Sequence, residues 1–197
     1  MNLAEQYVLL ALHDEKGTVH FNAASAYSYA LSGAILAELA ACGAIDYKDQ
    51  KVIIHDSCEC DDYVFRQVHA FMKRKNKSKN MKYWVYQIGS YVHQQKLDRT
   101  YYDRFVEAGI LKKEEKKVLF FFRQTVYPSA QKKIEESIRG RLKLQIRQKE
   151  FEHEQDLILL SLLQASGLEN TLFSEDEYRM RKKEIKAMLD NPAIMGK

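Results

Sequence analysis

The chain has 197 residues, of which 46% are hydrophobic and 29% charged, and its formal net charge is +4. This balance is typical of a soluble globular protein and excludes wholesale disorder, and so mild a charge does not by itself indicate a polyanionic partner. Only two prolines occur, which favours a mainly helical chain. We expect one domain over residues 1–197.

Helical periodicity and glycine or polar stop signals predict most of the elements in chain order. Between them, the polar segment KRKNKSKN (73–80) has no apolar residue and predicts a solvated loop. The expected helices cover residues 3–13, one or two segments between 24 and 42, 61–73, 81–94, 98–108, 129–152, 156–167 and 175–189. Two short hairpins are expected at 44–56 and 110–127.

The segment DLILLSLLQASG (156–167) predicts the helix around which the domain is built. Six of the seven residues from Leu157 to Leu163 are Leu or Ile. A helix without a polar face must be buried, and a run this short is well under the about 20 residues that a membrane span needs. We therefore expect a mainly α domain around this buried central helix.

Two segments of the chain repeat one pattern. Residues 36–54 align without a gap on residues 102–120, 66 positions later, so that Gly43 falls on Gly109. Each copy reads as a helix, a glycine that ends it, and a hairpin with a charged turn. Since a short hairpin is marginal alone, we expect each to dock on its helix, giving two helix-plus-hairpin units at about 24–54 and 98–125.

No catalytic, cofactor or metal signature stands out. The pair Cys58-x-Cys60 lacks the second pair that structural zinc requires, and we expect reduced thiols there and at Cys42. There is no HExxH motif, Gly-rich phosphate loop or GxSxG motif. We expect a non-enzymatic protein without cofactor or metal. The odd cysteine count and the lack of a signal peptide predict a cytoplasmic location.

A helix followed by a hairpin is also how winged-helix DNA-binding proteins end, so nucleic-acid binding is one alternative. The second hairpin does carry lysines. Against this, Glu114 and Glu115 lie at its tip, and the helix before it carries Asp98, Asp103 and Glu107. A phosphate-facing surface should instead be basic.

The tract VLFFF (118–122) predicts an exposed apolar patch in the second hairpin. Alternate strand residues face opposite sides, so Phe120 and Phe122 face away from Leu119 and Phe121. One face then stays exposed for a partner or membrane, unless a neighbouring helix covers it. Cations surround it in the sequence, as suits an anionic membrane surface; they are Lys112, Lys113, Lys116, Lys117, Arg123, Lys132 and Lys133.

Several segments, in this order, resemble the Golgi phosphoprotein 3 family. They are VLLALHDEKG, GAILAELAACGAI, YYDRFVEAGILKKEEKKVLFFF and LLSLLQASGLENTLFSEDEY. The resemblance runs from about residue 3 to 189 and implies a compact relative without the N-terminal extension of the eukaryotic members. It implies a helical adaptor, peripheral on the cytosolic face of a membrane, that binds phosphatidylinositol 4-phosphate and grips cytosolic tails of membrane proteins. The family links its hairpin, here about 114–125, to membrane contact and self-association.

The headgroup residues of the family are only partly present. Its Trp corresponds by counting to Asn22 and one of its Arg residues to Ser32. Its Arg-x-x-Arg pair counts to Gln95 and Asp98, although a shift of one residue places two cations there on one helical face. The resemblance therefore predicts a headgroup site made of Lys96, Arg99, Asn22 and Ser32, and a membrane or self-association hairpin made of Leu119, Phe120, Phe121 and Phe122.

The hypothesis from the sequence is thus a peripheral protein that binds an anionic lipid headgroup, phosphatidylinositol 4-phosphate by resemblance. Its expected partners are that lipid, cytosolic tails of membrane proteins and a second copy of the chain. Two alternatives stay open. One is the winged-helix nucleic-acid binder, and the other is a protein scaffold whose lipid site has degenerated.

Overall fold

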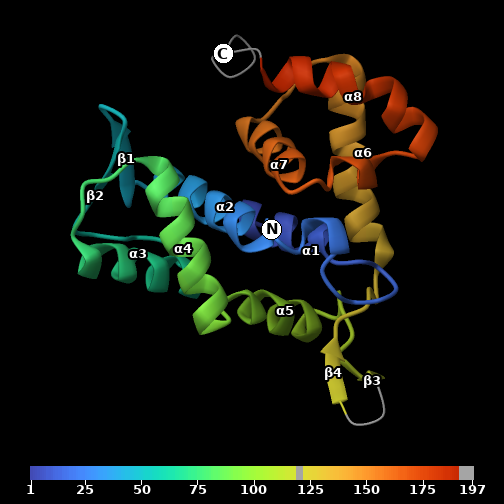
Figure 1. The fold of residues 1–197 in the computed structure, drawn as a ribbon, viewed down its shortest axis with the longest axis horizontal. Coiled ribbons are helices and arrows are strands. Elements are labelled where there is room, and N and C mark those ends of the chain that lie inside the picture. Colours follow the sequence, from blue (N-terminus) through green and yellow to red (C-terminus); the bar gives the residue numbers. More distant parts are fainter. Residues whose placement is uncertain (119–121, 191–197) are drawn as a thin grey trace.

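The computed structural model describes residues 1–118 and 122–190, and within them the chain is mainly helical with two small antiparallel hairpins (Figure 1). This confirms the predicted fold class. The elements are α1 (Leu3–Ala11), η1 (Phe21–Ala23), α2 (Tyr27–Ala41), β1 (Ile45–Lys48), β2 (Lys51–Ile54), α3 (Tyr63–Lys75), α4 (Met81–Gln95), α5 (Asp98–Glu107), β3 (Glu114–Val118), β4 (Phe122–Val126), α6 (Lys132–Gln148), α7 (Glu154–Ala165), η2 (Glu169–Leu172) and α8 (Glu175–Leu189).

Helix α1 is the most completely buried helix of the described chain. Every residue in it except Glu5 is buried, and it packs against α2, α5, α6 and α7. A capping box starts it, since the Asn2 side chain accepts from the Glu5 amide at 2.8 Å while Glu5 accepts from the Asn2 amide at 3.0 Å. The buried Gln6 is tolerated because its amide oxygen accepts from Arg141 at 2.6 Å.

Helix α7 is the predicted central helix, and it is buried on one side only. Leu157, Leu159, Leu160 and Leu163 are at most 1% exposed, but Ile158, Ser161 and Leu162 are half-buried. The expectation of burial on every side is therefore wrong. The apolar composition of a helix predicts that it packs against apolar neighbours. It does not determine how many elements of the fold surround the helix, and here one side is left partly exposed.

The helix ends of the two predicted repeat units are the same to the level of single hydrogen bonds. After α2, the Ala44 amide donates to the Leu39 carbonyl at 2.9 Å; after α5, the Ile110 amide donates to the Phe105 carbonyl at 2.8 Å. These pairs are 66 residues apart, as the alignment requires. Gly43 and Gly109 have φ of 69° and 68°, the left-handed conformation that ends such helices.

The hairpins do not follow the same alignment. The first has a two-residue turn at Asp49 and Gln50, both left-handed, so Lys51 opens β2. The residue aligned with Lys51 is Lys117, but it lies on β3, the first strand of the second hairpin. The gapless alignment is therefore wrong beyond the caps, because similar composition does not locate a turn.

The first hairpin is docked on the domain. Ile45 and Val52 are only 2% and 1% exposed, and the Val52 amide donates to the carbonyl of Lys79 at 2.8 Å, outside the hairpin. Ile45 and Val52 thus face the core, and this hairpin docks on the domain as predicted.

The second hairpin projects from the domain (Figure 1). Residues 112–117 and 123–125 are all exposed, so neither face of the described strands is covered until Val126. The expectation that this hairpin docks on its helix is therefore wrong for the described part. Of the predicted apolar tract, Leu119, Phe120 and Phe121 lie outside the described residues, and Phe122 is described only as the first backbone position of β4.

The cysteines also differ from the expectation of three reduced thiols. Cys42, at the end of α2, and Cys60, before α3, form a disulfide with Cα atoms 6.0 Å apart, and Cys58 is free. Their separation of 18 residues did not reveal that the first hairpin returns the chain to the end of α2. The argument from the cysteine count to a reducing compartment therefore no longer holds.

Candidate functional site

The base of the second hairpin borders a pocket of about 380 Å³. It lies where the start of α5 meets β4 and the turn that follows α1, three segments far apart in the sequence. Its lining residues are Leu12, Gly17, Thr18, Val19, Asp98, Arg99, Tyr102, Gln124, Thr125 and Tyr127.

The turn after α1 reaches this pocket because of Gly17. Its φ of 66° is left-handed, and a Cβ added there would overlap the backbone of Tyr127 and Pro128. The Gly17 carbonyl also accepts from the Tyr127 amide at 2.7 Å. Only glycine allows the turn to lie this close to the base of the hairpin.

A partly buried cluster of charged groups holds the same turn from its other side. Arg139 of α6 donates to Asp14 at 3.2 Å and lies 3.6 Å from Glu135, while the Asp14 carbonyl accepts from the Ser129 amide at 2.8 Å. Burial, and then the neighbouring Asp14 carboxylate, raises the pKa of Glu135 to about 7. The turn, the base of the hairpin and α6 are thus joined through one cluster of charged groups.

Of the four predicted headgroup residues, only Arg99 lines this pocket. Lys96 is exposed and ends α4 in a left-handed conformation with φ 52°, whereas Arg99 lies in the first turn of α5. The backbone links them, since the Arg99 amide donates to the Lys96 carbonyl at 3.1 Å. The expectation that both lie on one helical face is wrong, because the chain turns between two helices there.

Ser32 and Asn22 do not line the pocket. The Ser32 side chain is fully buried between α2 and α4, with its hydroxyl 2.9 Å from the Val85 carbonyl and 2.7 Å from that of Tyr29. Asn22 is exposed, and its side-chain amide donates to the Gly167 carbonyl after α7. The structure therefore does not bring these two residues together with Arg99.

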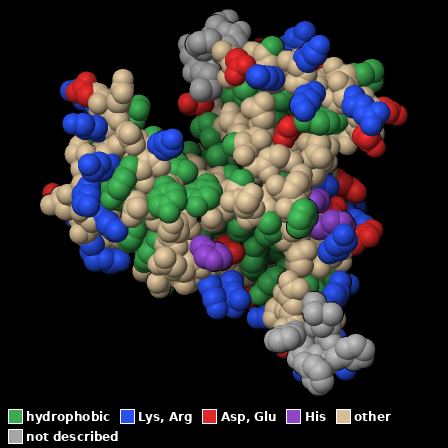
Figure 2. Space-filling view, viewed as in Figure 1, with side chains coloured by type: hydrophobic (Ala, Val, Ile, Leu, Met, Phe, Trp, Pro, Cys, Tyr) green, Lys and Arg blue, Asp and Glu red, His purple; other side chains and the backbone are tan. Residues whose placement is uncertain are grey.

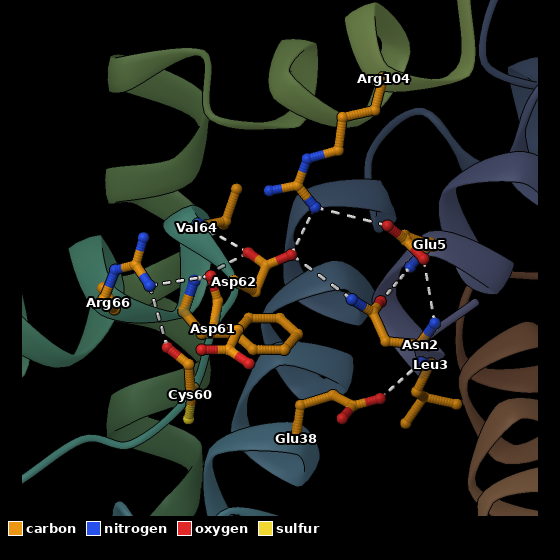
Figure 3. A network of polar contacts seen from close by, with 11 residues as sticks. Asn2, Leu3, Glu5, Glu38, Cys60, Asp61, Asp62, Val64, Arg66 and Arg104 are labelled. Carbon is orange, nitrogen blue, oxygen red and sulfur yellow. Dashed lines mark hydrogen bonds and ion pairs between the residues drawn. The ribbon is translucent and has the colours of Figure 1, made fainter. Parts of the chain in front are cut away.

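Helix α5, which carries Arg99 and leads to the hairpin, is held by a polar network (Figure 3). Arg104 donates to Asp62 at 2.5 Å and to Glu5 at 3.4 Å, joining α5 to the starts of α3 and α1. The same Asp62 carboxylate caps α3 by accepting from the Val64 amide at 2.7 Å. The hydrogen bond to Asp62 raises the pKa of Arg104 further, so the guanidinium stays charged.

Comparison with known families identifies the chain. The sequence model of the Golgi phosphoprotein 3 (GPP34) family matches residues 3–196. The chain belongs to this family. A search of curated proteins finds no match.

For a Golgi phosphoprotein 3 family member, the most informative residue of the pocket is Asp98. It stands where the family's second Arg of the Arg-x-x-Arg pair falls by direct counting, and it lines the pocket beside Arg99. Burial raises the pKa of Asp98, and the Tyr102 hydroxyl donates to its carboxylate at 3.4 Å. The sequence prediction instead takes the pair shifted by one residue, Lys96 and Arg99.

Within the described residues of this family member, no helix is both long and apolar enough to cross a bilayer.

Proposed function

We propose that this protein is a non-catalytic peripheral membrane adaptor that binds anionic lipid headgroups at the end formed by α5 and the second hairpin. The observation that carries the proposal is the hairpin itself, which projects with both faces of its described strands exposed. A two-stranded element whose residues 114–117 and 123–125 are all exposed is available to bind something outside the domain.

Charge on this hairpin suits an anionic membrane. Its exposed cations outnumber its two acids, Glu114 and Glu115, and each cation near an anionic surface adds about 1 kcal/mol of attraction. The ion pair of Arg123 with Glu115, at 3.3 Å, is solvent-exposed and costs little to break. The exposed cations are Lys112, Lys113, Lys116, Lys117 and Arg123.

The sequence adds an apolar contribution to the same proposal. The tract from Leu119 to Phe122 joins the two strands, and its three phenylalanines would enter the headgroup region while the cations stay in water. We assign this tract to membrane contact or self-association from the sequence and the family resemblance alone.

The pocket at the base of the hairpin is the proposed headgroup site. The exposed Arg99 guanidinium at its edge would pair with a phosphate, with Lys96 close by along the chain. Asp98 opposes an anion in the same pocket, so we expect weaker headgroup selectivity than the family resemblance implies for phosphatidylinositol 4-phosphate.

Co-sedimentation with vesicles tests this proposal. Neutral phosphatidylcholine vesicles are compared with vesicles containing phosphatidylserine or phosphatidylinositol 4-phosphate. We expect the protein to sediment only with anionic vesicles, Arg99→Gln to weaken binding several-fold and Asp98→Asn to strengthen it. Arg179→Gln, which changes an exposed cation of α8, is the matched control. Equal sedimentation with neutral and anionic vesicles would contradict the proposal.

Asp98 also supports the second candidate function, a protein scaffold with a degenerate lipid site on the cytosolic face of a membrane. Its partners would be short cytosolic tails of membrane proteins. If purified tails bind the protein while anionic vesicles do not, the scaffold is the better description and the headgroup proposal is wrong.

A further inference from the structure

The positive charge of the chain is concentrated in one segment. Residues 63–97, which include all of α3 and α4, contain eight Lys and Arg residues and no Asp or Glu. Since the whole chain carries +4, the remaining residues together carry −4. The cations of the segment are Arg66, Lys73, Arg74, Lys75, Lys77, Lys79, Lys82 and Lys96.

Folding gathers most of these cations on one surface with two more from the first hairpin. The Val52 amide of β2 donates to the Lys79 carbonyl at 2.8 Å, and the Lys75 ammonium donates to Gln87 of α4 at 3.1 Å. Figure 2 shows the cations crowded over β1, β2, α3 and α4. This polybasic face consists of Lys48, Lys51, Lys73, Arg74, Lys75, Lys77, Lys79 and Lys82.

Almost none of this charge is neutralised within the described residues. Lys73 pairs with Asp56 at 3.1 Å, and the other seven cations of the face form no ion pair there. Lys48 and Lys51 are direct cross-strand partners, an arrangement of like charges that destabilises a hairpin. Such uncompensated repulsion indicates an anionic partner outside the domain.

We propose that the polybasic face binds the surface of an anionic bilayer. Seven of its eight cations are lysines. The flexible ammonium of lysine is a point charge that suits diffuse attraction to a charged surface, whereas the bidentate pairing with a single phosphate is better made by arginine. Exposed apolar residues accompany them: Ile53, 40% exposed, shares a strand face with Lys51, and Tyr86, 57% exposed, lies one helical turn from Lys82.

A membrane fits this face better than a nucleic acid does. The C-terminus of α3 meets this face, and its free carbonyls favour cations. The N-terminus of α4 also lies here, but the Asn80 side chain already caps it by accepting from the Tyr83 amide at 2.9 Å. Only Arg74 of this face offers the planar guanidinium that pairs with phosphates and stacks on bases.

Figure 1 places the elements of this face at the opposite side of the molecule from the second hairpin, so the two proposed contacts are separate.

Two matched triple variants test the proposal in the full chain. One changes Lys77, Lys79 and Lys82 to Gln on the polybasic face, and the other changes Lys182, Lys183 and Lys186 to Gln on α8. All six are exposed, and both variants lower the net charge by three. The probe is co-sedimentation with phosphatidylserine-containing vesicles at low and physiological salt.

In a protein whose hairpin cations Lys116, Lys117 and Arg123 are already changed to Gln, we expect the polybasic-face changes to weaken binding about fivefold per cation, on the order of a hundredfold in all. The α8 variant should stay within about twofold of the unchanged protein, and binding should weaken with salt. Equal losses in both variants, or no loss in the first, would overturn the proposal.

A third variant separates this face from the hairpin site. Lys116, Lys117 and Arg123 are changed to Gln, again a charge change of three. If this variant abolishes vesicle binding while the polybasic-face variant keeps it, the inference is wrong and the hairpin site stands. If the polybasic-face variant instead loses binding to single-stranded RNA but not to vesicles, the partner is a nucleic acid and the inference is also wrong.

Discussion

The two helix-plus-hairpin units end their helices in the same way and then use their hairpins for opposite purposes. After Gly43 the hairpin turns back and buries Val52. After Gly109 the hairpin extends into solvent, with residues 112–117 exposed on both faces. A shared local signal thus sets where a helix stops, but the residues that follow decide whether the next element belongs to the core or to a surface.

The difference follows from the strand sequences. The first hairpin reads IDYK and KVII, and its apolar residues Ile45 and Val52 share one face of the sheet and are buried against the domain. The described part of the second hairpin reads EEKKV and FRQTV. Residues 114–117 of β3 are all charged, so both faces of this strand carry charges. Charged side chains on both faces cannot be buried without loss, so this hairpin projects.

The largest effect is expected at Gly17, on which the base of the second hairpin rests. Gly17→Ala would add the left-handed penalty of about 1–2 kcal/mol to a backbone overlap with Tyr127 and Pro128. We expect a total loss of more than about 3 kcal/mol in urea unfolding. Gly43→Ala is the matched control, because nothing lies within 4 Å of the added Cβ. Equal losses would show that the close contact is unimportant.

The second prediction compares the two hairpins directly. Val52→Ala removes a side chain that is 1% exposed in the docked hairpin, and we expect a loss of about 2 kcal/mol. Thr125→Ala lies in the exposed part of β4 and should change stability by less than about 0.5 kcal/mol. Thermal or urea denaturation measures both. Similar losses at the two positions would mean that the second hairpin is also docked.

The third prediction concerns the helix that carries the second hairpin. Arg104→Ala leaves Asp62, whose side chain is 8% exposed, without its cation, and we expect a loss of about 1–3 kcal/mol. Arg66→Ala, which removes only contacts to carbonyls of the same network, should cost less. Urea unfolding compares the two, and an equal or larger loss for Arg66→Ala would refute the assigned role of Arg104 (Figure 3).

The smallest expected effect is a pH dependence at the base of the second hairpin. The pKa of Glu135 is raised to about 7 in the folded protein, so the folded state binds this proton more tightly than the unfolded state. Its contribution to stability is therefore present at low pH and is lost as the pH rises from about 5 to about 8. Asp14, whose pKa is lowered, acts in the opposite direction at more acidic pH.

Glu135→Gln should remove this dependence. We expect the urea concentration at the unfolding midpoint of the unchanged protein to decrease as the pH is raised from about 5 to about 8, and that of the variant to change less. Glu136→Gln, on the neighbouring exposed residue of α6, is the control. If both variants keep the full dependence, another group is responsible.

Local signals predicted the fold well, and contacts between distant segments were the part that the sequence did not reveal. Gly43 and Gly109 marked helix ends because the left-handed cap is decided within six residues. Residues 175–189 were predicted as a helix with the bounds that α8 has. Burial of Ser32 against Val85, by contrast, depends on how α2 crosses α4.

The candidate site shows the same division. The exposed cations of the hairpin were evident from the sequence because they need no partner in the domain. The pairing of Cys42 with Cys60, and the position of Asp98 beside Gly17 in one pocket, depend on segments that only the folded chain brings together. No periodicity or motif encodes such contacts.

The central claim is that the projecting second hairpin meets an anionic membrane. Amide hydrogen exchange, followed by mass spectrometry with and without vesicles, tests it most directly. The account predicts slower exchange over residues 114–118 and 123–126 with phosphatidylserine-containing vesicles, no change there with neutral vesicles, and unchanged exchange in the buried α1. Unchanged exchange in the hairpin while the protein is bound to anionic vesicles would contradict it.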